Sequence, residues 1–168
     1  VWQQVAYHNL TDRVRAVRIA SGDLYHRLPP EAIPAVARNA FAAADAENRK
    51  YLQYQRDFAV GNVMVADYHL QGGDHLNAIT HYIRGLQKDS LMNYALLNLA
   101  AAYNSAGRNS EALKALRGAS VIDPQNERIF YNLGLLYYEM NDTDAAMKRF
   151  QKAIQLGSVD GGLYYNYR

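Results

Sequence analysis

The feature that most constrains the fold of this chain is a residue pattern that returns every 34 positions. A small or apolar pair followed by a ring-bearing residue recurs at Val65-Ala66-x2-His69, Leu99-Ala100-x2-Tyr103 and Leu133-Gly134-x2-Tyr137. Each copy is followed by its own alanine, at Ala78, Ala112 and Ala146. A repeat of this length encodes one supersecondary unit per copy, and each unit buries its apolar face by stacking on the next. The sequence therefore predicts a stack of repeated units.

The spacing inside each copy predicts two helices joined by a turn. In the last copy, apolar residues three and four positions apart form one helical face, at Phe130, Leu133, Gly134 and Tyr137. The polar stretch 141–144 then supplies turn and helix-capping residues before a second amphipathic pattern begins. Helical periodicity extends over nearly all of 12–157, without the alternating runs of a strand. We expect an all-α fold, an α/α solenoid of helical hairpins.

The residues of these copies resemble the tetratricopeptide repeat, whose W-x2-L-G-x2-Y, A-x3-F and P signature has the same spacing. The resemblance covers 59–158 and gives one repeat each to 59–92, 93–126 and 127–160. Other residues hold the tryptophan position, namely Asn62, Leu96 and Phe130. The resemblance implies a right-handed superhelix with a concave surface for another polypeptide.

Residues 1–58 do not keep the repeat, and we expect them to form helices that cap the N-terminal end of the solenoid. An amphipathic helix is predicted to begin near Thr11, with a break at Ser21-Gly22. One long helix is predicted over 31–55. Residues 12–28 also resemble the first helix of a HEAT-type repeat.

Both ends of the chain suggest a piece of a longer protein. The sequence begins Val1-Trp2-Gln3 rather than with methionine, and 161–168 has the spacing of the first helix of a further repeat, cut short. An uncapped solenoid end with exposed tyrosines favours contact between copies, so a dimer through this end is expected. A HEAT-like helix before tetratricopeptide repeats is similar to some bacterial periplasmic multihaem cytochrome proteins. This likeness favours the periplasm, with the cytoplasm as the alternative.

A second stripe on the first helix of each hairpin is the candidate binding surface, because one helix cannot bury both stripes in its own hairpin. We call this stripe the groove wall; its residues are Val60, Val63, Tyr94, Leu97, Asn98, Ala101, Arg128, Tyr131, Asn132, Leu135 and Tyr138. In the tetratricopeptide family this wall takes an extended peptide or a partner helix, so the resemblance implies a noncatalytic scaffold for a protein or peptide partner. Alternatively, the chain's own segments cover the wall.

Chaperone-binding members of the family use a carboxylate clamp of lysine, asparagine and further basic residues. Here Asn98 and Arg128 match two of its positions, whereas Val63, Asp67 and Asn132 replace the others. Recognition of a chaperone C-terminus is therefore disfavoured. The amides of Asn98 and Asn132 are candidates to hold the backbone of an extended ligand.

Composition excludes several other classes of function. A net charge of +2 gives no broad attraction for nucleic acid, and no apolar run is long enough for membrane insertion. The chain has no cysteine and no histidine pair at the spacing of a helical zinc site, so we expect no metal and no cofactor. His69 is predicted to be buried, whereas His75 and His81 are predicted at the surface.

No catalytic constellation has a recognisable spacing, and we expect no enzyme activity. The alternative is an accessory region of a larger bacterial enzyme or multihaem cytochrome whose chemistry lies outside these residues. The full-length sequence would distinguish this alternative from a dedicated adaptor.

Overall fold

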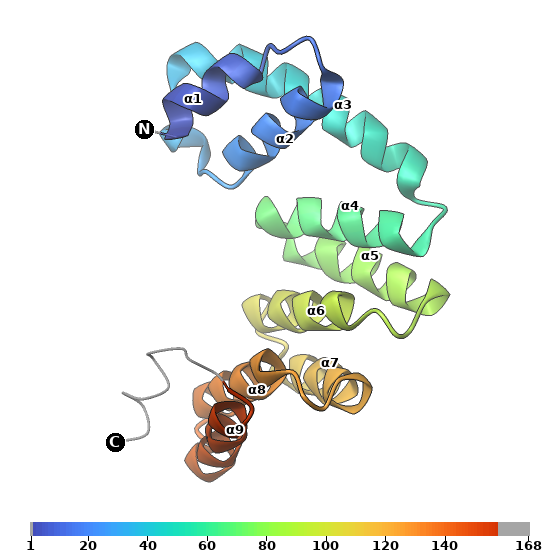
Figure 1. Cartoon of the computed structure of the whole chain (residues 1–168), viewed down its shortest axis with the longest axis vertical. Coiled ribbons are helices and arrows are strands. Elements are labelled where there is room, and N and C mark those ends of the chain that lie inside the picture. The colour runs from blue at the N-terminus through green and yellow to red at the C-terminus, as the bar shows by residue number, and fades with distance from the viewer. Residues whose placement is uncertain (1, 158–168) are drawn as a thin grey trace.

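The computed structural model describes residues 2–157, which form an arc of paired helices (Figure 1). The α-helices are α1 (Trp2–Asn9), α2 (Arg15–His26), α3 (Arg38–Gln55), α4 (Ala59–Gln71), α5 (His75–Lys88), α6 (Asn93–Ser105), α7 (Asn109–Ile122), α8 (Glu127–Glu139) and α9 (Thr143–Gln155). Two short 3-10 turns precede α3, at Pro30–Ala32 and Ala35–Ala37. The described residues contain no strand, which confirms the all-α prediction.

The three hairpins α4–α5, α6–α7 and α8–α9 turn in the same way. The second residue after each first helix has a left-handed backbone, with φ of 77° at Gly73, 71° at Gly107 and 61° at Asn141. Glycine and asparagine adopt this conformation at the least cost. The next backbone N–H then donates to a carbonyl near the helix end, at 2.8 Å from Asp74 to His69, 2.8 Å from Arg108 to Tyr103 and 2.9 Å from Asp142 to Tyr137. These bonds end each first helix by satisfying its exposed carbonyls.

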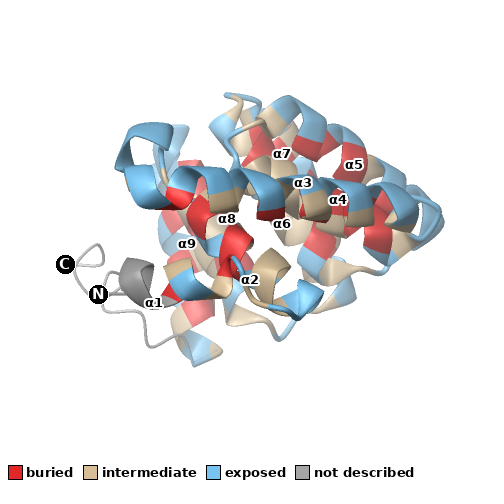
Figure 2. Cartoon of the chain, turned by 90° about the horizontal axis from the view of Figure 1, so that it is seen from above, coloured by how far each residue is buried: buried red, intermediate tan, exposed pale blue. Residues whose placement is uncertain are grey.

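Small residues let the two helices of a hairpin approach closely. The alanines at the crossing points are almost fully buried, namely Ala66, Ala78, Ala100, Ala112 and Ala146. At Gly134, an added Cβ would overlap the ring of Phe150 and lie 2.9 Å from its Cζ. Figure 2 shows that the buried residues lie where helices face one another and that the outer faces are exposed. The repeated pattern thus forms one continuous core through α4–α9.

The N-terminal helices have a separate core, built from Ala6, Leu10, Tyr25, Ile33, Ala37 and Ala44. The predicted break at Ser21-Gly22 is wrong, because α2 runs through both residues. Both are buried, and a Cβ at Gly22 would lie 3.2 Å from the Cβ of Ala44 on α3. The small side chains serve close packing of α2 on α3. The helix also begins at Arg15 rather than near Thr11, because the Asp12 carboxylate accepts from the Val14 N–H at 2.7 Å in the preceding turn.

The predicted helix over 31–55 begins later than expected, at Arg38. Pro34 has no N–H to donate, and it favours an extended conformation for Ile33, which has φ −74° and ψ 118°. The chain therefore makes two 3-10 turns before α3. Val36 lies in the second of these turns and is 67% exposed.

The chain departs from the repeat at the junction of α3 and α4. Gly61 on α4 lies against the backbone of Gln55 at the end of α3, where an added Cβ would overlap the Gln55 carbonyl oxygen. In Figure 1, α1–α3 lie at one end of the arc and the α8–α9 hairpin at the other.

Among residues 2–157, no helix is both long and apolar enough to cross a bilayer. The predicted further helix at 161–168 lies outside the described residues, and the repeat boundaries stay a prediction.

Candidate functional site

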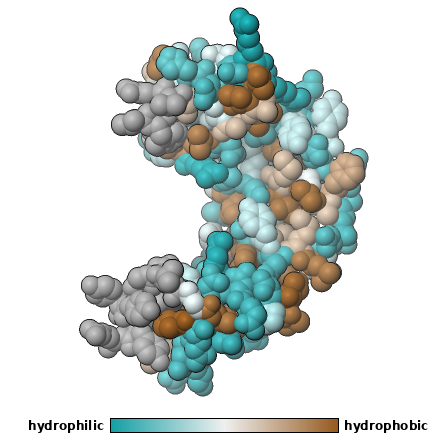
Figure 3. Space-filling view, in the orientation of Figure 1, coloured by the Kyte–Doolittle hydropathy of each residue, from teal (hydrophilic) through white to brown (hydrophobic). Residues whose placement is uncertain are grey.

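The hollow side of the arc is the candidate interaction surface (Figure 3). The groove-wall stripes of neighbouring first helices meet through side chains. Asp67 on α4 accepts hydrogen bonds from Tyr94 and Asn98 on α6. Between α6 and α8, Leu97 and Leu135 line the same cavity. The second stripes of α4, α6 and α8 are therefore adjacent, as the sequence predicts.

The cavity between α6, α7 and α8 has a volume of about 140 Å³. Four groove-wall residues line it, namely Leu97, Ala101, Asn132 and Leu135. Three more groove-wall side chains are largely exposed, at 59% for Val60, 58% for Tyr94 and 64% for Tyr138. Arg128 is also exposed. A partner would meet exposed aromatic side chains beside a small apolar depression.

Two groove-wall residues are less accessible than the sequence predicts. Val63 is 4% exposed and belongs to the core. It packs closely on α5, where a Cβ added at Gly85 would lie 3.0 Å from Val63 Cγ2. It therefore offers no surface to a partner, in contrast to the prediction. Tyr131 is half-buried, with its ring centroid 6.0 Å from that of Phe150. Its ring supports the α8–α9 hairpin as well as the wall.

A carboxylate links the α4 and α6 parts of the wall. Asp67 Oδ1 accepts hydrogen bonds from the hydroxyl of Tyr82 and from Asn98 Nδ2, the latter at 3.1 Å. Its Oδ2 accepts from the Tyr94 hydroxyl at 3.2 Å. Burial raises the pKa of the Tyr82 phenol, and the hydrogen bond to Asp67 raises it further, so Tyr82 stays a donor at neutral pH. One N–H of the Asn98 side chain is thus engaged within the protein.

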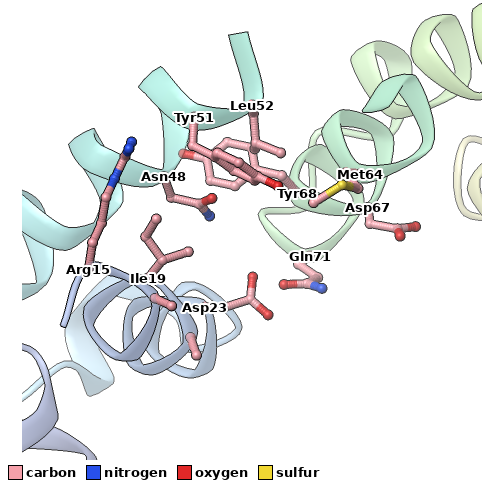
Figure 4. Close-up of a pocket in the computed structure, with 12 residues that line it drawn as sticks. Arg15, Ile19, Asp23, Asn48, Tyr51, Leu52, Met64, Asp67, Tyr68 and Gln71 are labelled. Carbon is pink, nitrogen blue, oxygen red and sulfur yellow. The ribbon is translucent and has the colours of Figure 1, made fainter. Parts of the chain in front are cut away.

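A larger cavity, of about 630 Å³, lies between α2, α3 and α4. Figure 4 shows Ile19 and Asp23 on the α2 side, and Asp67 and Gln71 on the α4 side. The repeat pattern could not reveal this cavity, because α2 and α3 do not carry the repeat. The one sequence feature that could have indicated this cavity was Asp67, a charged residue in the otherwise apolar second stripe of the first hairpin.

Two histidines on α4 and α5 differ from the prediction, because His81 is buried and His69 is only half-buried. His81 is 4% exposed and not at the surface, because the close packing of α4 on α5 covers it. Its ring stacks on that of His69, with centroids 5.7 Å apart. His69 is half-buried, and its Nδ1 lies 3.1 Å from the Asp74 carboxylate. Burial, together with the charges of Arg56, His69 and Arg84, lowers the pKa of His81 to about 4.

Acidification should destabilise the protein through His81. The pKa is about 4 in the folded state and 6.5 for an ordinary histidine, so the unfolded chain binds the proton first. The contribution of the neutral His81 ring to the free energy of unfolding is fully present above pH 6.5 and is lost as the pH falls toward 4. The full loss amounts to roughly 3 kcal/mol. Urea unfolding at several pH values should show this slope, and His81→Gln should flatten it between pH 6.5 and 4. An equal slope in both proteins would contradict the assignment.

Comparison with known protein families agrees with the hairpin geometry. A family model described as TPR repeat matches residues 100–141, and one described as Tetratricopeptide repeat matches residues 127–156. Residues 100–156 of this chain therefore carry tetratricopeptide repeats. Its repeats are similar in sequence to two curated proteins. One is the heat-shock protein cognate co-chaperone sgt12 of Aspergillus fumigatus, with 29% identity over 82 residues. The other is the TPR repeat-containing protein MJ1428 of Methanocaldococcus jannaschii, with 31% identity over 91 residues.

The similarity to these tetratricopeptide-repeat proteins is partial. It covers 49% of this chain and 24% of sgt12, and 54% of this chain and 16% of MJ1428. The chain therefore spans about a quarter or less of the length of these curated relatives.

Solved structures with the same fold include two tetratricopeptide-repeat domains and the protein MamA. The first repeat domain of Spaghetti (RPAP3), bound to the HSP90 peptide SRMEEVD, has a TM-score of 0.63 at 16% identity, covering 67% of this chain and 90% of that one. The Sgt2 domain of Aspergillus fumigatus has a TM-score of 0.60 at 22% identity, covering 65% and 74%. MamA has a TM-score of 0.62 at 19% identity, covering 84% and 77%. At these identities the likeness establishes the fold, an α-solenoid of helical hairpins.

Proposed function

We propose that this tetratricopeptide-repeat protein is a noncatalytic interaction module that binds an extended segment of a partner protein along the groove wall. The observation that carries the proposal is the exposure of Tyr94 and Tyr138 beside the cavity lined by Leu97 and Leu135. Tyrosine offers a large contact area at a small cost in conformational entropy, and partner side chains anchor best in desolvated depressions. The bound peptide of the Spaghetti domain supports an extended ligand on this fold.

The chemistry of the wall favours a ligand different from the SRMEEVD peptide. That peptide carries three carboxylate side chains in addition to its terminus. Here Asp67 replaces one position of the chaperone clamp and places a negative charge beside Tyr94 and Asn98 of the wall. Like charges at close range repel, so the wall should reject an acidic tail. The named relatives also lend no support to the alternative of a multihaem cytochrome.

The test is to select binders from a random peptide library displayed on phage and to measure their affinity by calorimetry. Tyr138→Ala and Tyr94→Ala should each weaken a selected peptide about tenfold, because each removes an exposed aromatic anchor. Val121→Ala is the matched control, because Val121 is 82% exposed on α7, outside the groove wall. The SRMEEVD peptide should bind far more weakly than the selected peptides. Equal affinity for all three variants would show that the groove wall is not the binding surface.

A periplasmic location and a dimer through the C-terminal end stay predictions. The end on which the dimer prediction depends lies outside the described residues. Sedimentation of the chain at several concentrations would test the dimer directly.

A further inference from the structure

The lining of the cavity between α2, α3 and α4 combines acidic and apolar side chains. Its volume of about 630 Å³ is large enough to enclose a long side chain. Asp23 lines it from α2 and Asp67 from α4. Ile19, Leu52 and Met64 supply apolar surface between them. Figure 4 shows Asp23 and Gln71 directed toward one another across the opening.

Asp67 has the capacity for one more hydrogen bond. A carboxylate offers about four acceptor positions, and Tyr82, Tyr94 and Asn98 fill three. The three donors come from α5 and α6 and fix the carboxylate before a ligand arrives. Among the side chains that the structure describes, no lysine, arginine or histidine forms an ion pair with Asp67. A fixed carboxylate without a counter-charge is suited to a cationic donor.

A second acceptor lies in the same lining. Gln71 Oε1 is enclosed and receives no hydrogen bond from the described residues. An unpaired acceptor of this kind is costly unless a ligand supplies the donor. Gln71 follows Asp67 by four positions, so both side chains lie on one face of α4. Together they offer two acceptors to one multivalent donor.

The cation already in the lining is engaged elsewhere. Arg15 donates from Nη2 to the carbonyl of Glu47 at 3.3 Å, and its guanidinium lies 6.0 Å from the centre of the Tyr51 ring. Asp23 has one exposed partner, Arg27 at 3.3 Å, in an i,i+4 pair of a kind that contributes little. The lining therefore carries two carboxylates against one arginine, a net negative charge.

From this arrangement we propose that the cavity between α2, α3 and α4 binds a lysine or arginine side chain of the partner segment. The proposal rests on the proposed function and names the chemistry of its ligand. The ammonium or guanidinium group bonds Asp67 and Gln71, and the aliphatic stem packs on Ile19, Leu52 and Met64. An apolar side chain of the same length would leave both acceptors unpaired, and an acidic one would be repelled.

The experiment uses the methionine methyl groups as reporters in NMR spectra of the described chain. Of the four methionines, Met64 lines the cavity, whereas Met140 and Met147 are exposed at the C-terminal hairpin. The probes are the Nα-acetyl amides of arginine, lysine, norleucine and glutamate. The two cationic probes should shift the Met64 signal saturably and leave Met140 and Met147 unchanged. The norleucine and glutamate probes should not shift Met64, and added salt should weaken the cationic probes.

Two variants locate the binding group. Asp67→Asn should weaken the cationic probes about tenfold, the size expected for loss of a charge-assisted hydrogen bond. Asp57→Asn is the matched control, because Asp57 is an exposed carboxylate that does not line the cavity. If Asp67→Asn proves unstable, Asp23→Asn takes its place, with a smaller loss expected.

The outcomes separate this inference from the proposed function. Equal shifts with norleucine, or no Met64 shift with any probe, would overturn the cationic pocket while leaving peptide binding at the groove wall intact. A cationic shift that Asp67→Asn and Asp23→Asn leave unchanged would also overturn it. Selective shifts by the cationic probes, together with a failure to select any peptide, would support the pocket and count against the proposed function.

Discussion

Replacing Gly61 with alanine should lower the free energy of unfolding by about 3 kcal/mol, because the new methyl group would overlap backbone that cannot move aside. The obstructing atom is the carbonyl oxygen of Gln55, at the end of α3. A flexible side chain could rotate away, but this carbonyl is fixed by the turn in which Phe58 N–H donates to it at 3.1 Å. Relief therefore requires moving α3 relative to α4. Urea unfolding followed by circular dichroism measures the loss.

Gly118 provides the matched control for Gly61. It lies inside α7, and a Cβ there would meet only Leu96 Cδ1, at 4.0 Å. Gly118→Ala should therefore stabilise the protein by about 0.5–1 kcal/mol through helix propensity alone. Two variants with the same chemical change should thus have opposite signs. A Gly61→Ala protein as stable as the original would show that α3 and α4 do not approach one another as described.

Phe150→Ala should cost about 3–5 kcal/mol, because the side chain is 5% exposed and its loss leaves a cavity inside the last hairpin. The ring packs between Gly134 and Tyr131 of α8. Met147→Ala is the control on the same helix, since Met147 is 43% exposed. Its cost should stay well below that of Phe150→Ala. Thermal and urea unfolding of both variants test this difference.

A double-mutant cycle identifies the physical cause of that cost. In the original protein, Gly134→Ala should destabilise, because its Cβ would overlap the Phe150 ring. In the Phe150→Ala background, the same change should be neutral or stabilising, since the methyl group enters vacated space. The coupling between the two positions should exceed about 1 kcal/mol. Additive effects would mean that glycine is needed at 134 for a reason other than the ring.

The helical hairpins could be predicted because their causes are local. The left-handed turn at Gly107 depends only on backbone hydrogen bonds between residues close in sequence. The sequence specifies such a turn directly. The small residue at each helix crossing is likewise set by its own hairpin. The 34-residue period then repeats the same helical hairpin three times. Errors in the hairpins concerned single side chains, such as Val63, whose burial depends on how closely Gly85 lets α5 approach.

The N-terminal helices were predicted less well because their pattern has no second copy to compare. Ser21-Gly22 was predicted to break a helix, but both residues lie inside α2 and are buried. Gly22 packs against Ala44 of α3. In the first hairpin, His81 on α5 was likewise predicted at the surface from its neighbours in sequence, although it is buried. In each case the deciding neighbour lies on another helix, far along the chain.

The sequence by itself determined the hairpins, their stacking and the order of residues along the groove wall, because each depends on contacts within one repeat or between adjacent ones. Tertiary structure alone decided the cavity between α2, α3 and α4, and with it the setting of Asp67. That cavity depends on the angle between a repeating and a nonrepeating part of the chain. The angle is set by contacts such as that of Gly61 with Gln55, which no periodic pattern encodes.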